Sequence, residues 1–254
     1  MLPGTLRAAS SLGTIAPLAR RLAVLAFALC ACAQPVLAFE FLLEEKTAPP
    51  PRSTLWSRKG EPLVDVAKAC PGIVIELRYA TGKNIARKPI YPTYARCLVR
   101  EQVAGQLREA HAWLQKQGLG LKIWDAYRPP WAHWQLWERV KNRDYVGDPK
   151  TGGSLHSWGA AVDATLVDAR GREMKMPTDF DVFSPAARKT YRGGDPVVAK
   201  NLRTLQAAMD HAGFLGIRDE WWHFVSRDWA SYRSTTVSLG ADPAAKPGRA
   251  AQSN

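Results

Sequence analysis

The sequence has no hydrophobic run as long as the roughly 20 residues that a membrane-spanning helix requires. It also lacks internal repeats, a heptad pattern and any dense run of lysine and arginine. The net charge of +12 is spread along the chain, which is typical of a solvated surface, so nucleic acid is not expected as a partner. What remains is an ordinary globular composition, 46% hydrophobic and 23% charged, in 254 residues that suit one domain with tails.

The N-terminal 38 residues contain no acidic side chain. Arg20 and Arg21 precede an apolar stretch at residues 22–33, and short side chains follow up to Ala38. This order predicts a secretory signal peptide and an exported protein, periplasmic or otherwise extracytoplasmic, with a buried core helix as the alternative. The paired arginines also suit twin-arginine export. Membrane attachment is expected only if Cys32 is lipidated.

Cysteine is scarce, and the predicted cleavage leaves only Cys70 and Cys97. In an oxidising compartment the two thiols could form one disulfide. Two buried free thiols are the alternative, and the spacing of 27 residues does not choose between them. Neither cysteine lies near the motifs described below, so neither is expected to be a nucleophile.

Composition divides the rest of the chain into three parts. A proline-rich stretch predicts an arm or linker at residues 39–60, after the signal peptide at residues 1–38. The folded domain is expected at residues 61–234. The alanine-, proline-, glycine- and serine-rich tail at residues 235–254 is expected to be disordered.

Hydrophobic periodicity predicts both strands and helices in this domain. The expected strands are 73–79, 121–126, 160–166 and 221–225, and the expected helices are 97–116, 131–141 and 195–212. They do not follow a regular strand–helix–strand alternation. The pattern therefore favours an α+β fold with a mainly antiparallel central sheet backed by helices.

Two segments carry the residue types of a catalytic zinc site. They are SLHSWGAAVD at residues 154–163 and DEWWHF at residues 219–224. A catalytic zinc ion takes three protein ligands and leaves a position for water, and His156, Asp163 and His223 fit that set. Glu220 then remains as the base that accepts a proton from the water. The spacing of either segment alone is weak evidence for a metal site. The remaining histidines lie in helical patterns and are expected to be non-catalytic; they are His111, His133 and His211.

The spacing of these residues sets two geometric conditions. Glu220 and His223 would point to opposite sides of a flat strand, so Glu220 must lie at the strand entry or in a bulge. His156 is expected in a loop that turns into the strand carrying Asp163. That aspartate projects from an otherwise apolar strand, which is costly without a partner.

A third segment, WDAYRPP at residues 124–130, places Arg128 after a strand and before a proline turn. A guanidinium at the site could stabilise the oxyanion of a tetrahedral intermediate. A surface ion pair with Asp125 is the structural alternative, and the segment taken alone favours the ion pair.

Together these segments resemble the D-alanyl-D-alanine dipeptidases, zinc enzymes that share a fold with D,D-carboxypeptidases and the hedgehog signalling domain. The resemblance covers residues 61–230 and also includes RYATGKN at 78–84 and Phe-Asp at 180–181. It implies one Zn²⁺ per chain, held by the three ligands named above. It implies that Glu220 is the general base and that Arg128 polarises the scissile carbonyl.

The resemblance also implies three contacts to the free amino end of a substrate, from Tyr79, Ser154 and Asp181. Asp181 aligns only with a one-residue gap, and Asp179 is a nearby competitor. The chain departs from the family pattern at Ala126, where glycine is usual, and at Ile85, where an aromatic residue is usual. The connection before His156 is also short, and it could shape the substrate cavity.

The expected activity is zinc-dependent hydrolysis of a small dipeptide, D-alanyl-D-alanine, to two D-alanines in cell-wall peptide turnover. A D,D-carboxypeptidase acting on longer wall peptides is the alternative within the same enzyme class. A non-catalytic zinc- or wall-binding module is the alternative in another class, but such a module would need neither Glu220 nor Arg128.

Overall fold

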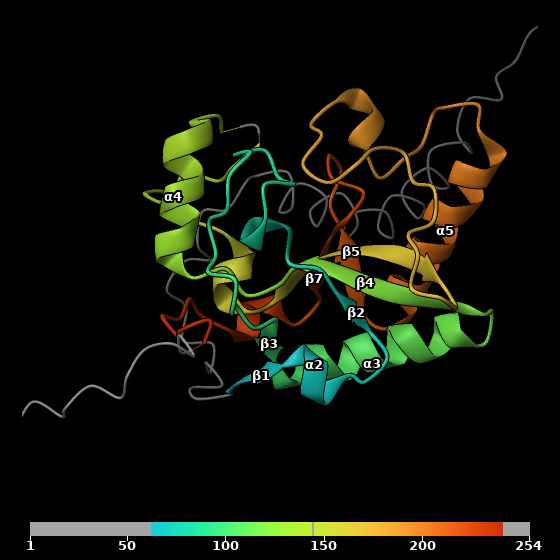
Figure 1. Ribbon diagram of the computed structural model, residues 1–254, viewed down its shortest axis with the longest axis horizontal. Coiled ribbons are helices and arrows are strands. Elements are labelled where there is room, and N and C mark those ends of the chain that lie inside the picture. The colour runs from blue at the N-terminus through green and yellow to red at the C-terminus, as the bar shows by residue number, and fades with distance from the viewer. Residues whose placement is uncertain (1–61, 144, 241–254) are drawn as a thin grey trace, which may run out of the picture. The chain divides into compact units, whose positions relative to one another are not determined.

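The computed structural model describes residues 62–143 and 145–240, which belong to a unit of the chain comprising residues 42–254 (Figure 1). The predicted signal peptide at 1–38 and arm at 39–60 lie outside the described residues. None of the helices within the two described ranges is both long and apolar enough to cross a lipid bilayer.

A five-stranded sheet forms the centre of the described domain. Its strand order is β2-β4-β5-β7-β6, and only the β2–β4 pair is parallel. The strands are β2 (Val74–Ile75), β4 (Leu119–Asp125), β5 (Ala161–Asp168), β7 (His223–Ser226) and β6 (Phe214–Gly216). The α+β class with a mainly antiparallel sheet is confirmed.

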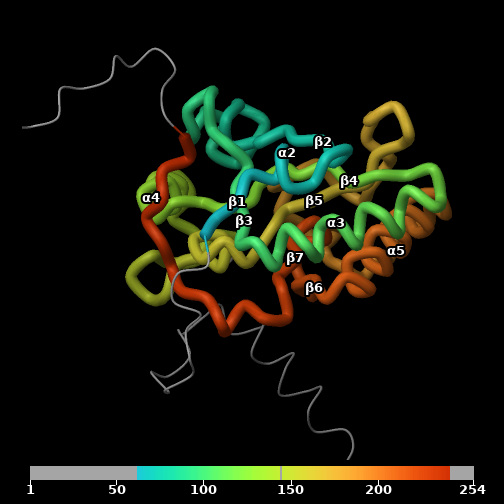
Figure 2. The backbone as a smooth tube through the Cα atoms, turned by 90° about the horizontal axis from the view of Figure 1, so that it is seen from below, coloured from blue at the N-terminus to red at the C-terminus, as the bar shows by residue number. Residues whose placement is uncertain are grey.

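Two helices, α3 (Glu101–Gln115) and α5 (Pro196–His211), lie side by side against one face of the sheet (Figure 2). They bury apolar stripes that include Leu107 of α3 and Leu205 of α5. The third long helix, α4 (Pro130–Val140), follows β4. Several of the longer loops lie on the side of the sheet away from α3 (Figure 1).

Helix α5 begins where its sequence predicts. The Asp195 carboxylate accepts hydrogen bonds from the N–H groups of Val197 and Val198, at 2.8 and 3.3 Å. Pro196 occupies the first turn, where its missing N–H leaves no bond unmade.

Short elements account for most differences from the predicted pattern. The predicted helix 97–116 begins only at Glu101, because β3 (Leu98–Arg100) pairs with β1 (Leu63–Asp65) in a separate two-stranded sheet. The predicted strand 73–79 is reduced to β2, because the chain turns into the 3-10 helix η1 (Arg78–Ala80). The other short elements are α2 (Val66–Ala69), η2 (Leu155–Trp158), η3 (Pro185–Ala187) and η4 (Trp229–Ser231).

The folded domain extends beyond its predicted end at residue 234. The Thr235 N–H donates to the Ser157 carbonyl at 3.0 Å, and the Arg96 N–H donates to the Leu239 carbonyl at 2.7 Å. Leu239 is buried. Residues 235–240 of the predicted disordered tail therefore pack on the domain, and residues 241–254 lie outside the described part of the chain.

The two cysteines within the described residues, Cys70 and Cys97, are buried free thiols. The Cys70 thiol donates to the Ala104 carbonyl at 3.3 Å. Burial raises the pKa of both thiols, so neither is poised as a thiolate.

Candidate metal centre and active site

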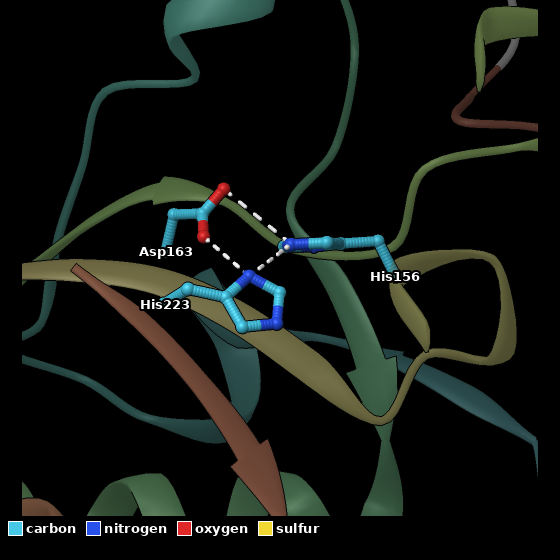
Figure 3. Close-up of side chains that lie close together, drawn as sticks. All are labelled: His156, Asp163 and His223. Atoms are coloured by element: carbon cyan, nitrogen blue, oxygen red, sulfur yellow. Dashed lines mark hydrogen bonds and ion pairs between the residues drawn. The ribbon is translucent and has the colours of Figure 1, made fainter. Parts of the chain in front are cut away.

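Three predicted metal ligands meet where β5 and β7 pair. Asp163 on β5 lies directly opposite His223, the first residue of β7, and His156 reaches them from η2 (Figure 3). The His223 Nδ1 lies 3.0 Å from Asp163 Oδ1 and 3.1 Å from His156 Nε2, and His156 Nε2 lies 3.4 Å from Asp163 Oδ2. One ligand atom from each residue therefore lies within 4.8 Å of the others.

These distances and atom types fit a zinc ion. Ligand atoms around tetrahedral zinc lie roughly 3.3 Å apart, given bonds of about 2.0–2.1 Å. Two imidazole nitrogens and one carboxylate oxygen form a common ligand set of catalytic zinc sites, with the fourth position left for water. The neighbouring imidazoles also suit the ionised form of Asp163. Although burial raises its pKa, His156 and His223 hold the pKa well below its usual range.

The orientation of His156 follows from its second ring nitrogen. Nδ1 lies 2.7 Å from the Ala126 carbonyl, and because a carbonyl only accepts, Nδ1 carries the hydrogen. Nε2 is then left with its lone pair directed at Asp163 and His223, as a metal ligand requires. The backbone carbonyl just after β4 therefore selects the tautomer of a residue on η2.

Local sequence builds the turn that holds His156. The Ser154 hydroxyl oxygen accepts a bond from the His156 N–H at 3.2 Å and caps η2. Gly159 ends η2 at a φ of +70°, and a Cβ there would lie 2.5 Å from a Leu63 methyl group. The structure thus explains why this segment has serine at 154 and glycine at 159: the serine caps η2, and only glycine fits the left-handed end of the turn.

Glu220 meets the geometric condition that its spacing imposes. It lies just before β7, and its carbonyl accepts a bond from the His223 N–H at 3.2 Å. This turn brings the Glu220 carboxylate to 3.8 Å from His223 Nδ1, and the side chain is 15% exposed. Glu220 therefore lies at the rim of the metal cluster, on the strand entry.

Arg128 lies inside the site and not on the surface. Its guanidinium donates twice to Asp125 Oδ2, at 3.0 and 2.7 Å, and lies 3.8 Å from Asp163 Oδ2. The ion pair with Asp125 expected as the structural alternative is present, but it is buried and lies beside the candidate ligand Asp163. The pairing thus positions the guanidinium toward the site.

Asp125 and Tyr91 are site residues whose contacts the sequence does not reveal. Asp125 is completely buried, and its second oxygen accepts a bond from the Tyr91 hydroxyl at 2.7 Å. Asp125 was identifiable only as a partner for Arg128, and nothing in the sequence marked Tyr91. Together they fix the buried end of the arginine.

Tyr79 and Asp181 contact each other beside the metal cluster. The Tyr79 hydroxyl lies 3.4 Å from Asp181 Oδ1, the Ile85 N–H donates to Asp181 Oδ2 at 3.1 Å, and the Arg128 guanidinium lies over the Tyr79 ring. Asp179 instead has a side chain 67% exposed and pairs with Arg78 at 3.6 Å. Of the two aspartates, Asp181 is therefore the one that faces the site.

Burial raises the pKa of Asp181 to about 7, and the nearby Asp163 carboxylate adds to the rise. Because this value lies above the ordinary 3.8, protonated Asp181 stabilises the fold at low pH, and that contribution is lost as pH rises toward and through 7. Asp181→Asn stays neutral at every pH and suits the left-handed backbone at φ +57°. We therefore compare the free energy of unfolding of the metal-free variant with that of metal-free wild type. The variant-minus-wild-type difference is expected to increase by about 2–3 kcal/mol from pH 5 to pH 8.

Urea unfolding in the presence of a chelator measures this difference at both pH values. Other titrating groups are shared by the two proteins and cancel in the comparison. A stability difference that stays constant with pH would show that Asp181 is already ionised in the folded state at pH 5.

Comparison with known proteins identifies one family whose sequence pattern matches the part of the chain that contains the candidate site. A family model described as D-ala-D-ala dipeptidase matches residues 59–239. The chain is similar to the D-alanyl-D-alanine dipeptidase of Escherichia coli K12, 40% identical over 170 residues, or 67% of this chain and 87% of the relative. Proteins of the same name from Enterococcus faecalis V583 and Streptomyces coelicolor are 31% and 29% identical, covering 60% and 62% of this chain and 85% and 87% of the relatives.

Proposed function

This chain belongs to the D-alanyl-D-alanine dipeptidase family of metallopeptidases, and we propose that it hydrolyses D-alanyl-D-alanine to two D-alanines with one zinc ion. The proposal is carried by the close approach of three candidate ligands, His156, Asp163 and His223. Glu220 lies 3.8 Å from His223, and Arg128 lies 3.8 Å from Asp163. A ligand set alone would suit a binding module, but a base and a guanidinium beside it suit hydrolysis.

His156, Asp163 and His223 would hold the zinc ion, and when bound it would supply Lewis-acid activation of water and of the scissile carbonyl. Glu220 accepts the proton of the attacking water and returns it to the amine that leaves. Arg128, held by Asp125, donates to the oxygen on which negative charge develops. The reaction breaks one amide bond and consumes one water.

The amino end of the dipeptide has a matching site. Asp181 and the Tyr79 hydroxyl present oxygen atoms to a buried position beside the cluster. A substrate ammonium there would pair with the Asp181 carboxylate and favour its ionised form. The Ser154 hydroxyl, whose oxygen caps η2, keeps its hydrogen for a further bond.

The function is tested by measuring D-alanine release from D-alanyl-D-alanine, beside a pentapeptide ending in D-alanyl-D-alanine, with and without a chelator. Chelator-sensitive cleavage of the dipeptide alone is expected. Cleavage of the pentapeptide as well would identify a D,D-carboxypeptidase. Absence of cleavage of either peptide by zinc-loaded protein would contradict the proposed substrate.

We also propose that the enzyme acts outside the cytoplasm, in turnover of cell-wall peptides. The support is the order of charged, apolar and short residues up to Ala38. Full-length protein expressed in a Gram-negative host is expected in the periplasmic fraction with Phe39 as its first residue. Recovery from the cytoplasm with residues 1–38 intact would contradict this.

A further inference from the structure

Two loops beside the site are joined by a pair of stacked aromatic rings. Tyr145, in the connection between α4 and η2, stacks on Phe183 with ring centroids 4.4 Å apart and an interplanar angle of 18°. Phe183 also lies edge-on to Trp222, at 6.0 Å, and Trp222 precedes the metal ligand His223. The stack thus links the connection that leads to Ser154 and His156 with the loop that carries Asp181.

The connection that carries Tyr145 is held in place at several points. His133 on α4 donates through Nε2 to the Gly147 carbonyl at 2.8 Å, and Val146 is buried. Burial lowers the pKa of His133 to about 4, so this anchor is a neutral imidazole at physiological pH. We call residues 145–153 the strap.

Close packing and a capped turn fix the remainder of the strap. A Cβ on Gly147 would lie 2.7 Å from the Gly153 carbonyl oxygen, which leaves no room for another residue type. The Asp148 carboxylate accepts bonds from the Lys150 N–H at 2.9 Å and from Arg143 at 2.6 Å. Tyr145 is therefore presented by a defined turn, and its ring position follows from the backbone that carries it.

The position of the stack relates to the direction in which a peptide substrate would run. On the proposed function, the amino end of the dipeptide lies among Tyr79, Ser154 and Asp181. Any additional residue of a longer peptide is attached at that end. The strap leads into Ser154, and Phe183 lies two residues after Asp181, so the stacked rings join the two segments that carry these contacts to the amino end.

The low exposure of the amine site agrees with this arrangement. Tyr79 and Asp181 are 3% and 8% exposed, although a substrate has to reach them. An open groove for a wall peptide would leave such side chains accessible along one side. The burial of both side chains is what a site enclosed around a small substrate would show.

We propose that the Tyr145–Phe183 stack sets the substrate length, admitting a free dipeptide and excluding peptides that continue beyond its amino end. The proposal rests on the proposed function and names the residues that separate a dipeptidase from a D,D-carboxypeptidase in this chain. Tyr145 is the residue to change, because its side chain is exposed, whereas Phe183 also packs against the domain core.

The test compares kcat/KM for D-alanyl-D-alanine with kcat/KM for diacetyl-L-lysyl-D-alanyl-D-alanine in zinc-loaded protein. Tyr145→Ala is expected to raise the tripeptide-to-dipeptide ratio by about tenfold or more, since a steric barrier is removed while the reacting groups stay in place. Tyr145→Phe keeps the ring and is expected to keep the wild-type ratio. Trp134→Ala is the matched control, because Trp134 is 40% exposed against 38% for Tyr145 and lies outside the stack.

Three results would overturn the proposal. One is an unchanged ratio in a Tyr145→Ala protein that still hydrolyses the dipeptide. Another is loss of both activities in that variant, which would give the ring a role in the reaction itself. The third is a wild-type enzyme that cleaves the tripeptide as readily as the dipeptide. Wild-type protein that cleaves neither peptide would instead refute the proposed function on which this inference rests.

Discussion

Replacing Glu220 by glutamine is expected to lower kcat for D-alanyl-D-alanine by about 10²–10⁴-fold while the protein keeps its zinc. The amide preserves the size of the side chain but cannot accept the proton of the attacking water. Glu220 lies outside the set of three ligands, at 3.8 Å from His223 Nδ1, so metal content is expected to stay near one per chain. D-Alanine release and zinc content of the dialysed protein measure the two effects.

The neighbouring Asp219 supplies the control for this experiment. Its side chain is 46% exposed and pairs with Arg218, so Asp219→Asn removes a carboxylate one residue away without entering the site. It is expected to retain wild-type turnover. A Glu220→Gln enzyme that keeps kcat within about tenfold of wild type would show that another group takes the proton.

Replacing His223 by alanine is expected to remove both the metal and the activity. Only His156 and Asp163 would remain as ligands, one fewer than the three protein ligands that catalytic zinc sites use. Loss of even an outer-shell partner costs 10–100-fold in metal affinity, so loss of a ligand is expected to cost about 100-fold or more. Zinc content after dialysis and D-alanine release at matched total zinc measure both losses.

His211 is the matched control for the histidine variant. It lies at the end of α5 with a side chain that is 52% exposed, near Glu109 and away from the ligands. His211→Ala is expected to keep zinc and turnover. Retention of one zinc per chain by His223→Ala would remove His223 from the ligand set and would require a different third ligand.

Much of the backbone geometry around the candidate ligands was predictable because its parts are local in sequence. The capping of η2 by Ser154 and the left-handed Gly159 depend on neighbours within a few residues of His156. The turn from Glu220 to His223 spans one hydrogen bond between residues three apart. Such geometry recurs wherever the sequence recurs, so a family resemblance carries it reliably.

Several features were not predictable, because each depends on a distant partner. The strand at 98–100 forms by pairing with residues 63–65, and this overrode the helical periodicity only at the start of the predicted helix 97–116. The choice of Asp181 over Asp179 depends on Tyr79 and Ile85, about a hundred positions earlier in the chain. Cys70 and Cys97 are free thiols in the described domain, although two cysteines in a protein expected to be exported could have formed a disulfide.

The sequence by itself determined the fold class, the metal-ligand candidates and the candidate base, since these follow from periodicity and from residue types at short, ordered spacings. The family followed from the resemblance of those segments to known enzymes. Only the tertiary structure decided which side chains face one another across the site. It placed Arg128 against Asp125 and Asp163, joined Tyr91 to that pair, and stacked Tyr145 on Phe183. The physical reason is that these contacts form between segments brought together by packing of the whole domain, and no local pattern encodes the partner of a residue that lies far along the chain.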